Sequence, residues 1–167
     1  AKFDASQLYE VLPDFHNTRV RYENFLRAVE KDICGRAEEV RSEIDWVKSR
    51  SDLCGKIVDK IASGEIPLRV THNDTKLNNV MLDDATGKGL AVIDLDTVMP
   101  GSLCYDFGDS IRFGCNSAAE DEPDTEKVHF LFDLYKTYLE GYLSAVGNSV
   151  TQEEKENLPT GAVLMTY

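Results

Sequence analysis

VTHNDTKLNNVMLD, residues 70–83, and GLAVIDLD, residues 89–96, are the two stretches that decide the fold of this chain. Their apolar runs predict two short strands, over 79–83 and 90–94. The segment between the strands, DATGKG, is rich in turn-forming residues. We therefore expect the two strands to pair as an antiparallel β-hairpin.

The predicted hairpin brings polar side chains together at one end. Asn79 begins the first strand and Asp94 ends the second, so antiparallel pairing places both at the same end. His72 and Asp74 lie in the segment just before that end. Carboxylate and amide oxygens are the ligands that a hard cation such as Mg²⁺ prefers. The sequence thus predicts a cluster of Asp74, Asn79 and Asp94 that is suited to magnesium.

Helices are expected over most of the remaining chain, which makes the predicted fold α+β and mainly α. Asn17 and Thr18 can cap a first helix that runs to about Lys31. Apolar spacing predicts a second helix from about residue 36 and a third over 53–62, and a short strand is expected over 68–70.

After Pro100-Gly101 we expect a short helix over 106–112 with Asp106 as its N-cap, and then an acidic loop over 116–125. A long helix follows, and its row of tyrosines is expected in the core or at a helix interface: Tyr135, Tyr138 and Tyr142.

A capping-box pattern marks the start of a last helix. Thr151 and Glu154 have the required spacing, and Pro159 is expected to limit how far the helix extends.

The composition excludes several classes of partner. The 167 residues carry a net charge of −12, which repels phosphate backbones and anionic lipids and argues against nucleic acid or membrane partners. No apolar stretch approaches the length of a membrane span. The four cysteines show no CxxC and no zinc-ligand spacing, which favours reduced thiols in a cytoplasmic protein.

The pattern HxDxKxxN, followed by a hairpin and an aspartate, resembles the catalytic and metal-binding segments of kinase-fold phosphotransferases. This resemblance implies that Asp74 is the catalytic base and that Lys76 meets the γ-phosphate of ATP. It also implies that Asn79 and Asp94 bind Mg²⁺, and that His72 supports the loop without transferring a proton in the reaction.

A literal Asp-Phe-Gly occurs at residues 106–108, but it follows the hairpin and does not close it. Asp94 is therefore the better match to the metal-binding aspartate of the family. Asp96 follows two residues later on the same face of the strand, where it could contact either the metal or the acceptor.

The absence of activation-loop signatures favours the aminoglycoside phosphotransferase and choline kinase branch. Within this branch, strings such as LPDFHNTRVRY and AVIDLDTVMPGSLCYDFGDSIR resemble the N-acetylhexosamine 1-kinases, a family of sugar kinases in carbohydrate metabolism. The resemblance implies ATP-dependent phosphorylation of the anomeric hydroxyl of N-acetylglucosamine or N-acetylgalactosamine. Five residues that flank the motifs are candidates for the acceptor site: Asp96, Arg112, Tyr105, His16 and Phe15.

Neither GxxxxGK[ST] nor GxGxxG occurs in the chain. In the resembled family the phosphate-covering loop belongs to an N-terminal lobe. We therefore expect residues 1–167 to form a partial C-terminal lobe, without the ATP-binding lobe and with a truncated C-terminus. Such a fragment is expected to bind ATP weakly and to be inactive alone.

Three alternatives remain open at this point. The fold can act on choline, an aminoglycoside or another alcohol. AVIDLDTV also resembles the nucleophile motif of haloacid-dehalogenase phosphatases. Finally, the chain can be a non-catalytic acidic interaction module. The sequence does not give the oligomeric state.

Overall fold

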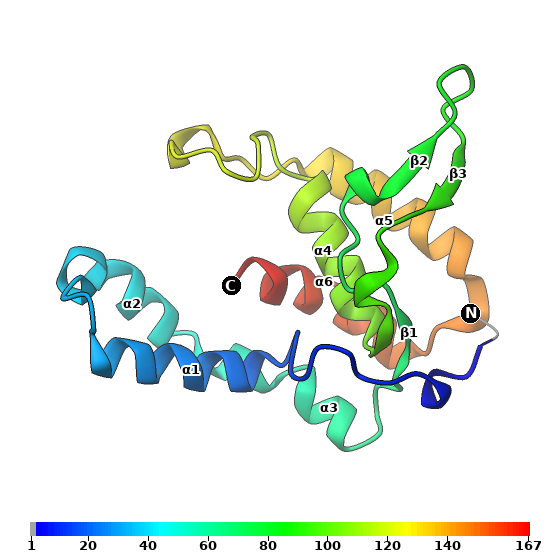
Figure 1. The fold of residues 1–167 in the computed structure, drawn as a ribbon. Helices are drawn as coiled ribbons and strands as arrows, with labels where there is room; N and C mark the ends of the chain where they lie inside the picture. Colours follow the sequence, from blue (N-terminus) through cyan, green and yellow to red (C-terminus); the bar gives the residue numbers. More distant parts are fainter. Residues whose placement is uncertain (1–2) are drawn as a thin grey trace.

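The computed structural model describes residues 3–167 and shows a mainly helical fold with two small antiparallel sheets (Figure 1). The α-helices are α1 Thr18–Lys31, α2 Arg41–Lys48, α3 Val58–Ala62, α4 Leu103–Gly114, α5 Phe132–Val146 and α6 Gln152–Thr166. The strands are β1 Arg69–Thr71, β2 Val80–Leu82, β3 Gly89–Val92 and β4 Met99–Gly101. Short 3₁₀-helices are η1 Ala5–Gln7, η2 Ala37–Val40, η3 Ser51–Gly55, η4 Leu77–Asn79, η5 Leu95–Thr97, η6 Thr125–Lys127 and η7 Gly147–Ser149. This architecture confirms the predicted α+β, mainly α class.

The predicted hairpin is present. Strands β2 and β3 pair antiparallel, with Val80 opposite Val92, and a register shift follows Met81. Gly87 takes the left-handed conformation in the turn, at φ +67°, where a glycine carries no steric cost. The hairpin projects away from the helices, at the upper right of Figure 1.

A second sheet was predicted only in part. Strand β1 occupies the expected position, and its partner is β4, which includes Pro100 and Gly101 and was not predicted. A Cβ at Gly101 would lie 2.3 Å from Thr71 Oγ1, so this pairing requires glycine there. Because the sheet has two strands only, Pro100 interrupts no central hydrogen-bond ladder.

The predicted start of α4 was wrong. The helix begins at Leu103, and its N-cap is Ser102, whose side chain accepts a hydrogen bond from the Cys104 N–H. Asp106 lies inside the helix, where its carboxylate accepts hydrogen bonds from the backbone of the loop after β1. A long-range partner therefore decides the role of this aspartate.

The region between α1 and β1 is more broken than predicted. In place of two long helices, η2 leads into the short α2, and η3 leads into the short α3. The first helix was predicted correctly, because Asn17 caps α1 by accepting a hydrogen bond from the Val20 N–H at 3.2 Å.

Helix α6 extends past Pro159, so the expected limit was wrong. Its capping box is present as predicted, with Thr151 and Glu154 each accepting a hydrogen bond from the other's backbone N–H. A proline inside a helix removes one hydrogen bond. Here Leu158, Gly161 and Leu164 are buried, and we attribute the continuation of the helix to this packing.

The centre of the molecule is the crossing of α4 and α6. A Cβ on Gly108 would lie 2.4 Å from the Gly161 carbonyl oxygen, and one on Gly161 would lie 2.0 Å from the Cys104 carbonyl oxygen. Phe107 is buried beside this crossing and packs against the predicted tyrosine row, with ring centroids 5.1 to 6.3 Å away: Tyr135, Tyr138 and Tyr142. Tyr135 and Tyr142 are half-buried and Tyr138 is exposed, so the row lies at a helix interface, the second of the two predicted positions.

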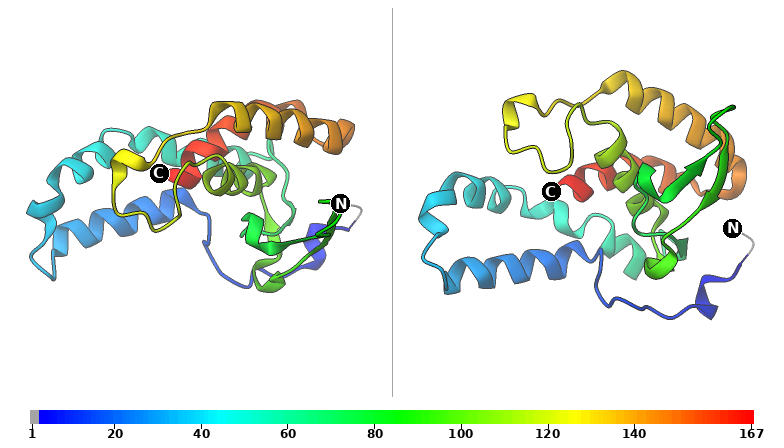
Figure 2. Two further views of the ribbon diagram at one scale, coloured as in Figure 1. Left: turned by 90° about the horizontal axis from the view of Figure 1, so that it is seen from above. Right: turned by 45° about the horizontal axis from the view of Figure 1, so that its top comes forward.

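Helices α1 and α2 form an arm that extends from the body (Figure 2). Cys34 lies exposed in the segment that connects α1 to η2, whereas the other cysteines are buried: Cys54, Cys104 and Cys115. Within residues 3–167, no helix combines the length and apolarity needed to cross a membrane.

Candidate active site

Helix α4 holds the loop of residues 72–75 by its backbone. Asp106 accepts hydrogen bonds from the N–H of His72 at 2.9 Å and of Asn73 at 2.7 Å. Asp109 accepts one from the N–H of Thr75 at 2.7 Å. The two aspartates lie three residues apart on one face of the helix. Three backbone donors of the 72–75 loop are thus fixed by two carboxylates.

Asn73 fixes the turn of this loop. It takes a left-handed conformation, at φ 66°, which asparagine tolerates better than most residues. Its amide donates to the Thr97 carbonyl at 2.9 Å, and its own carbonyl accepts from His16 Nε2 at 2.9 Å. These contacts leave the neighbouring Asp74 side chain at the wall of a cavity.

His72 connects the 72–75 loop to the hairpin. Its Nε2 lies 2.9 Å from the Ile93 carbonyl oxygen, which can only accept, so this nitrogen carries the proton. Its Nδ1 then accepts the Asp74 N–H at 3.3 Å. Both ring nitrogens are engaged with backbone groups, an arrangement suited to support of the loop, although the role of His72 in a reaction stays a prediction.

Asp74, Lys76 and Asn79 lie together as the motif spacing predicts. The Asn79 amide nitrogen donates to Asp74 Oδ2 at 3.0 Å and to the Asp74 carbonyl at 2.8 Å. The Lys76 ammonium lies 3.3 Å from the same Oδ2. Asp74 Oδ2 is therefore held by a hydrogen bond from Asn79 and an ion pair with Lys76, and Oδ1 has no hydrogen-bond partner within residues 3–167.

The hairpin places Asn79 and Asp94 at the same end, as predicted. The Asn79 carbonyl accepts the Ile93 N–H at 2.9 Å, which continues the ladder of β2 and β3 up to the residue before Asp94. Asp94 is exposed, in a left-handed conformation at φ 60°.

These residues fit a divalent cation. Because the Asn79 amide nitrogen is used by Asp74, the Asn79 Oδ1 is left as a possible ligand, at the same end of the hairpin as the exposed Asp94. In the part of the chain that the structure describes, no three histidine, cysteine or acidic side chains gather as a metal site. An amide and one carboxylate suit Mg²⁺, which commonly takes its further ligands from water and substrate phosphates.

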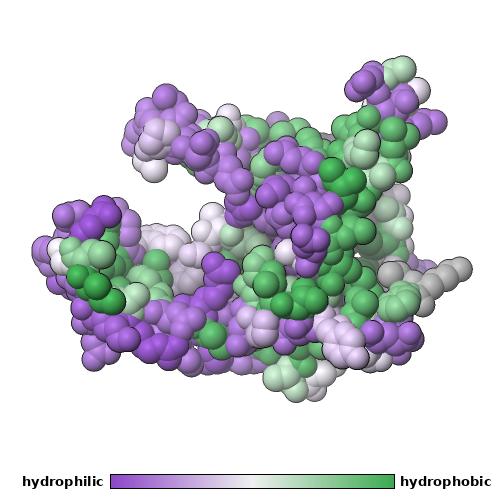
Figure 3. Space-filling view, in the orientation of Figure 1, coloured by the Kyte–Doolittle hydropathy of each residue, from purple (hydrophilic) through white to green (hydrophobic). Residues whose placement is uncertain are grey.

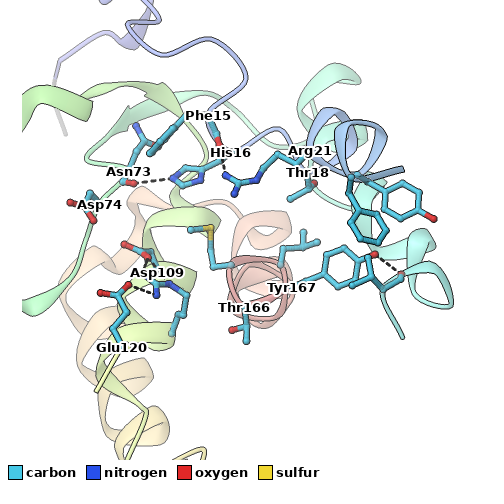
Figure 4. Close-up of a pocket in the computed structure, with 16 residues that line it drawn as sticks. Phe15, His16, Thr18, Arg21, Asn73, Asp74, Asp109, Glu120, Thr166 and Tyr167 are labelled. Atoms are coloured by element: carbon cyan, nitrogen blue, oxygen red, sulfur yellow. Dashed lines mark hydrogen bonds and ion pairs between the residues drawn. The ribbon is translucent and has the colours of Figure 1, made fainter. Parts of the chain in front are cut away.

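A cavity of about 670 Å³ opens beside Asp74 (Figure 4). It lies between the arm and the body of the molecule, in the region where Figure 3 shows a hollow. Its wall combines residues before and along α1 with residues of α4, α6 and the acidic loop: Phe15, His16, Thr18, Arg21, Tyr22, Phe25, Val47, Asn73, Asp74, Asp109, Arg112, Glu120, Leu164, Met165, Thr166 and Tyr167.

The five predicted acceptor residues divide into two groups. Phe15, His16 and Arg112 line the cavity. Tyr105 does not line it, because it is buried behind His16 with the ring centroids 5.5 Å apart. Asp96, the first choice from sequence, is exposed in η5 and does not line the cavity.

Several residues of the cavity were not predicted. Asp109 and Glu120 frame Arg112: Asp109 Oδ1 accepts from Arg112 Nε at 3.1 Å and Nη2 at 2.9 Å, and Glu120 accepts from Nη1 at 2.7 Å. Arg21 and Tyr167 contribute to the opposite wall and the floor. The i, i+3 spacing of Asp109 and Arg112 was the one local signal that could have indicated this pair.

Burial affects the pKa of two side chains of the cavity, His16 and Arg112. It lowers the pKa of His16 below its ordinary value of 6.5, so the ring is neutral at pH 7 and donates from Nε2. Burial would also lower the pKa of Arg112, but the carboxylates of Glu120 and Asp109 outweigh it and raise this pKa. Arg112 is therefore a charged group that is already paired.

Two comparisons with known proteins agree with this geometry. The profile of the phosphotransferase enzyme family matches residues 1–142. An uncharacterized kinase-like protein of Caenorhabditis elegans is 27% identical over 130 residues, 78% of this chain and 32% of that protein. The chain thus spans about a third of the length of this relative. The match argues against the haloacid-dehalogenase alternative, and within residues 3–167 the strand before Asp94 pairs only with β2, in an antiparallel hairpin. With most of its length matched and its HxDxKxxN cluster assembled beside a cavity, the chain belongs to the phosphotransferase enzyme family, within the kinase-like superfamily.

Proposed function

We propose that this protein is an ATP- and Mg²⁺-dependent small-molecule kinase of the cytoplasm that phosphorylates the anomeric hydroxyl of N-acetylglucosamine or N-acetylgalactosamine. One observation carries the proposal: Asp74 lies in the wall of a cavity large enough for a sugar, with one carboxylate oxygen held by Asn79 and Lys76. The product would be the sugar 1-phosphate.

Asp74 is suited to the role of general base. Because Oδ2 is held by the Asn79 amide and the Lys76 ammonium, the other oxygen can accept the proton of an acceptor hydroxyl in the cavity. A positioned general base contributes about 10²- to 10⁴-fold to the rate of such a reaction. Lys76, beside Asp74, is suited to binding the transferred phosphoryl group.

Asn79 Oδ1 and the Asp94 carboxylate would hold Mg²⁺ at the end of the hairpin. Bound Mg-ATP would supply the phosphoryl group and neutralise the charge that develops during transfer. The apolar side chains of the hairpin are largely exposed, with 46% of Leu82, 64% of Leu90 and 55% of Val92 accessible to solvent. We propose that they contact the nucleotide and the nucleotide-binding lobe of the family, and that phosphotransfer needs that lobe in addition to residues 1–167.

The polar end of the cavity favours a neutral acceptor with several hydroxyl groups. Asp109, Arg112 and Glu120 form a line of paired charges, so an anionic acceptor meets no unpaired cation on the α4 side. Carboxylate oxygens and the edges of a guanidinium group hydrogen-bond well with hydroxyls.

A second class of acceptor is supported by the other end of the cavity. Tyr22, Phe25 and Tyr167 lie there, and the first two rings stack with centroids 6.0 Å apart. Aromatic faces and a net charge of −12 favour a cation, such as choline or an aminoglycoside.

Turnover of an acceptor panel tests the proposal. ADP release by the full-length protein with Mg-ATP is measured against N-acetylglucosamine, N-acetylgalactosamine, choline and an aminoglycoside, with Asp74→Asn as the matched variant. We expect turnover with an N-acetylhexosamine and a loss of about 10³-fold in the variant. Turnover on choline or the aminoglycoside alone would keep the base and overturn the sugar. Equal rates for the two proteins would overturn the role of Asp74.

A further inference from the structure

Asp109 lies between the acceptor cavity and the 72–75 loop. One of its carboxylate oxygens accepts hydrogen bonds from the cavity side, and the other accepts a hydrogen bond from the loop. Its side chain is only 4% exposed. Oδ2 accepts the N–H of Thr75 at 2.7 Å, and Oδ1 accepts from the guanidinium of Arg112 at 2.9 and 3.1 Å. One rigid, buried group therefore touches both parts of the site.

On the loop side, the contact acts directly on the backbone of Asp74. The N–H that Asp109 accepts belongs to the peptide bond joining Asp74 to Thr75. The Thr75 hydroxyl also donates to the Asp106 carbonyl at 2.5 Å, and its own carbonyl accepts from Ser110 at 3.1 Å. The backbone N–H, hydroxyl and carbonyl of Thr75 are thus all bonded to α4, whereas the carbonyl of Asp74 is bonded to Asn79.

On the cavity side, Asp109 bonds to Arg112, a residue that an acceptor in the cavity would contact. Arg112 lines the cavity, and its outer nitrogen donates to Glu120 of the acidic loop at 2.7 Å. An acceptor that hydrogen-bonds to Arg112 or Glu120 changes the position of the guanidinium. Because Asp109 is buried between fixed partners, a shift at Oδ1 is transmitted to Oδ2 and to Thr75.

We propose that Asp109 is a positioning residue that couples occupation of the acceptor cavity to the orientation of Asp74. The inference rests on the proposed function, since it assigns a role within the same site. Charge-assisted hydrogen bonds to a buried carboxylate are strong and directional, which suits this role.

Kinetics of the full-length protein test the coupling. In Asp109→Asn the side chain keeps its shape but presents an amide NH₂ to one of two donors, so it loses either Thr75 or Arg112. We expect kcat to fall about 30-fold, the equivalent of one hydrogen bond to a charged group. Glu120→Gln is the matched variant on the cavity side only. It leaves the contacts of Asp109 intact, and we expect it to raise the KM of the acceptor more than it lowers kcat.

Hydrogen exchange of the Thr75 amide gives a readout that does not depend on turnover. With N-acetylglucosamine as the probe, we expect exchange of this amide to slow in the wild-type protein. In Asp109→Asn it should be faster and insensitive to the sugar. A residue that only stabilises the fold would give faster exchange in the variant without any response to the sugar in the wild type.

The outcomes separate this inference from the proposed function. Wild-type turnover together with a variant kcat within threefold of it overturns the inference and keeps the kinase. If the wild type turns over no acceptor, the proposed function fails, and the inference is then decided by Thr75 exchange: no response to the sugar overturns it. If Asp109→Asn does not fold, Arg112→Lys tests the same link, and a Thr75 amide as responsive to the sugar as in wild type overturns the coupling.

Discussion

The 72–75 loop and the β2–β3 hairpin carry the two halves of the candidate site, and they differ in how far they are packed against the rest of the described chain. The loop packs against α4 with Asn73 buried and its other residues half-buried, and Asp106 and Asp109 accept hydrogen bonds from its N–H groups at 72, 73 and 75. The hairpin projects from the body with all four residues of β3 exposed (Figure 3). One link between the hairpin and the loop is the hydrogen bond from His72 Nε2 to the Ile93 carbonyl oxygen.

This contrast indicates which part of the candidate site is positioned by contacts within residues 3–167. Asp74, the proposed base, lies in a loop that is held by helix α4, and α4 in turn crosses α6 closely. The proposed metal ligands lie at the end of a hairpin whose apolar side chains the described residues leave largely uncovered. Changes near α4 should therefore alter the stability of this chain strongly, and changes on the hairpin should barely alter it.

The largest effect is expected at the helix crossing. In Gly161→Ala the added Cβ would lie 2.0 Å from the Cys104 carbonyl oxygen, which forces α4 and α6 apart. We expect the free energy of unfolding to fall by about 3 kcal/mol, measured by urea denaturation.

Gly141→Ala is the matched control, because it lies in α5, and beyond its own helical turn no atom of residues 3–167 lies within 4 Å of the added Cβ. Alanine is favoured over glycine in a helix, so this variant should be as stable as wild type or slightly more stable. Similar losses in both variants would contradict a close crossing of α4 and α6.

An intermediate effect is expected from the titration of Asp106. Burial raises the pKa of this carboxyl from 3.8 to about 6. The folded state therefore binds more protons than the unfolded state between about pH 4 and 6, and the contribution of Asp106 to stability falls as pH rises through this window.

Urea denaturation of wild type and Asp106→Asn across this pH range isolates the contribution, because the variant lacks the titrating group. Wild type should lose stability relative to the variant as pH rises from 4 to 6. Two parallel stability curves would show that the pKa of Asp106 is not raised.

The smallest effect is expected on the hairpin. Leu90 is 64% exposed, so Leu90→Ala should change the free energy of unfolding of residues 1–167 by less than about 0.5 kcal/mol. A loss above about 1.5 kcal/mol would mean that the hairpin packs against another surface in solution, and the contrast with the loop would fail.

Local sequence signals predicted the hairpin, the first helix and the capping box of α6. In each case the decisive contacts join residues close in the chain, such as Asn17 with Val20 and Thr151 with Glu154. The shared end of Asn79 and Asp94 also followed, because the hairpin register alone determines it.

The errors involve partners far apart in the chain. Asp106 was expected to cap a helix, but it binds a loop more than 30 residues earlier. Asp109 was missed for the same reason, because its partner Thr75 lies 34 residues away. Pro159 was expected to limit helix α6. The helix continues past it, and we attribute this continuation to packing against α4. Asp96 lies near the motif in sequence yet outside the cavity, since the walls come from α1, α4 and α6.

Because one of the four cysteines is exposed and the other three are buried, the arm can be labelled chemically at a single position. Cys34 is exposed, whereas Cys54, Cys104 and Cys115 are buried, and burial raises the pKa of Cys104 to about 11. Thiolates are the reactive species, so a maleimide dye at neutral pH should attach to Cys34 far faster than to the other three. A single fluorophore would then report from the connection between α1 and η2, and its anisotropy would show whether the arm stiffens when a small molecule enters the cavity.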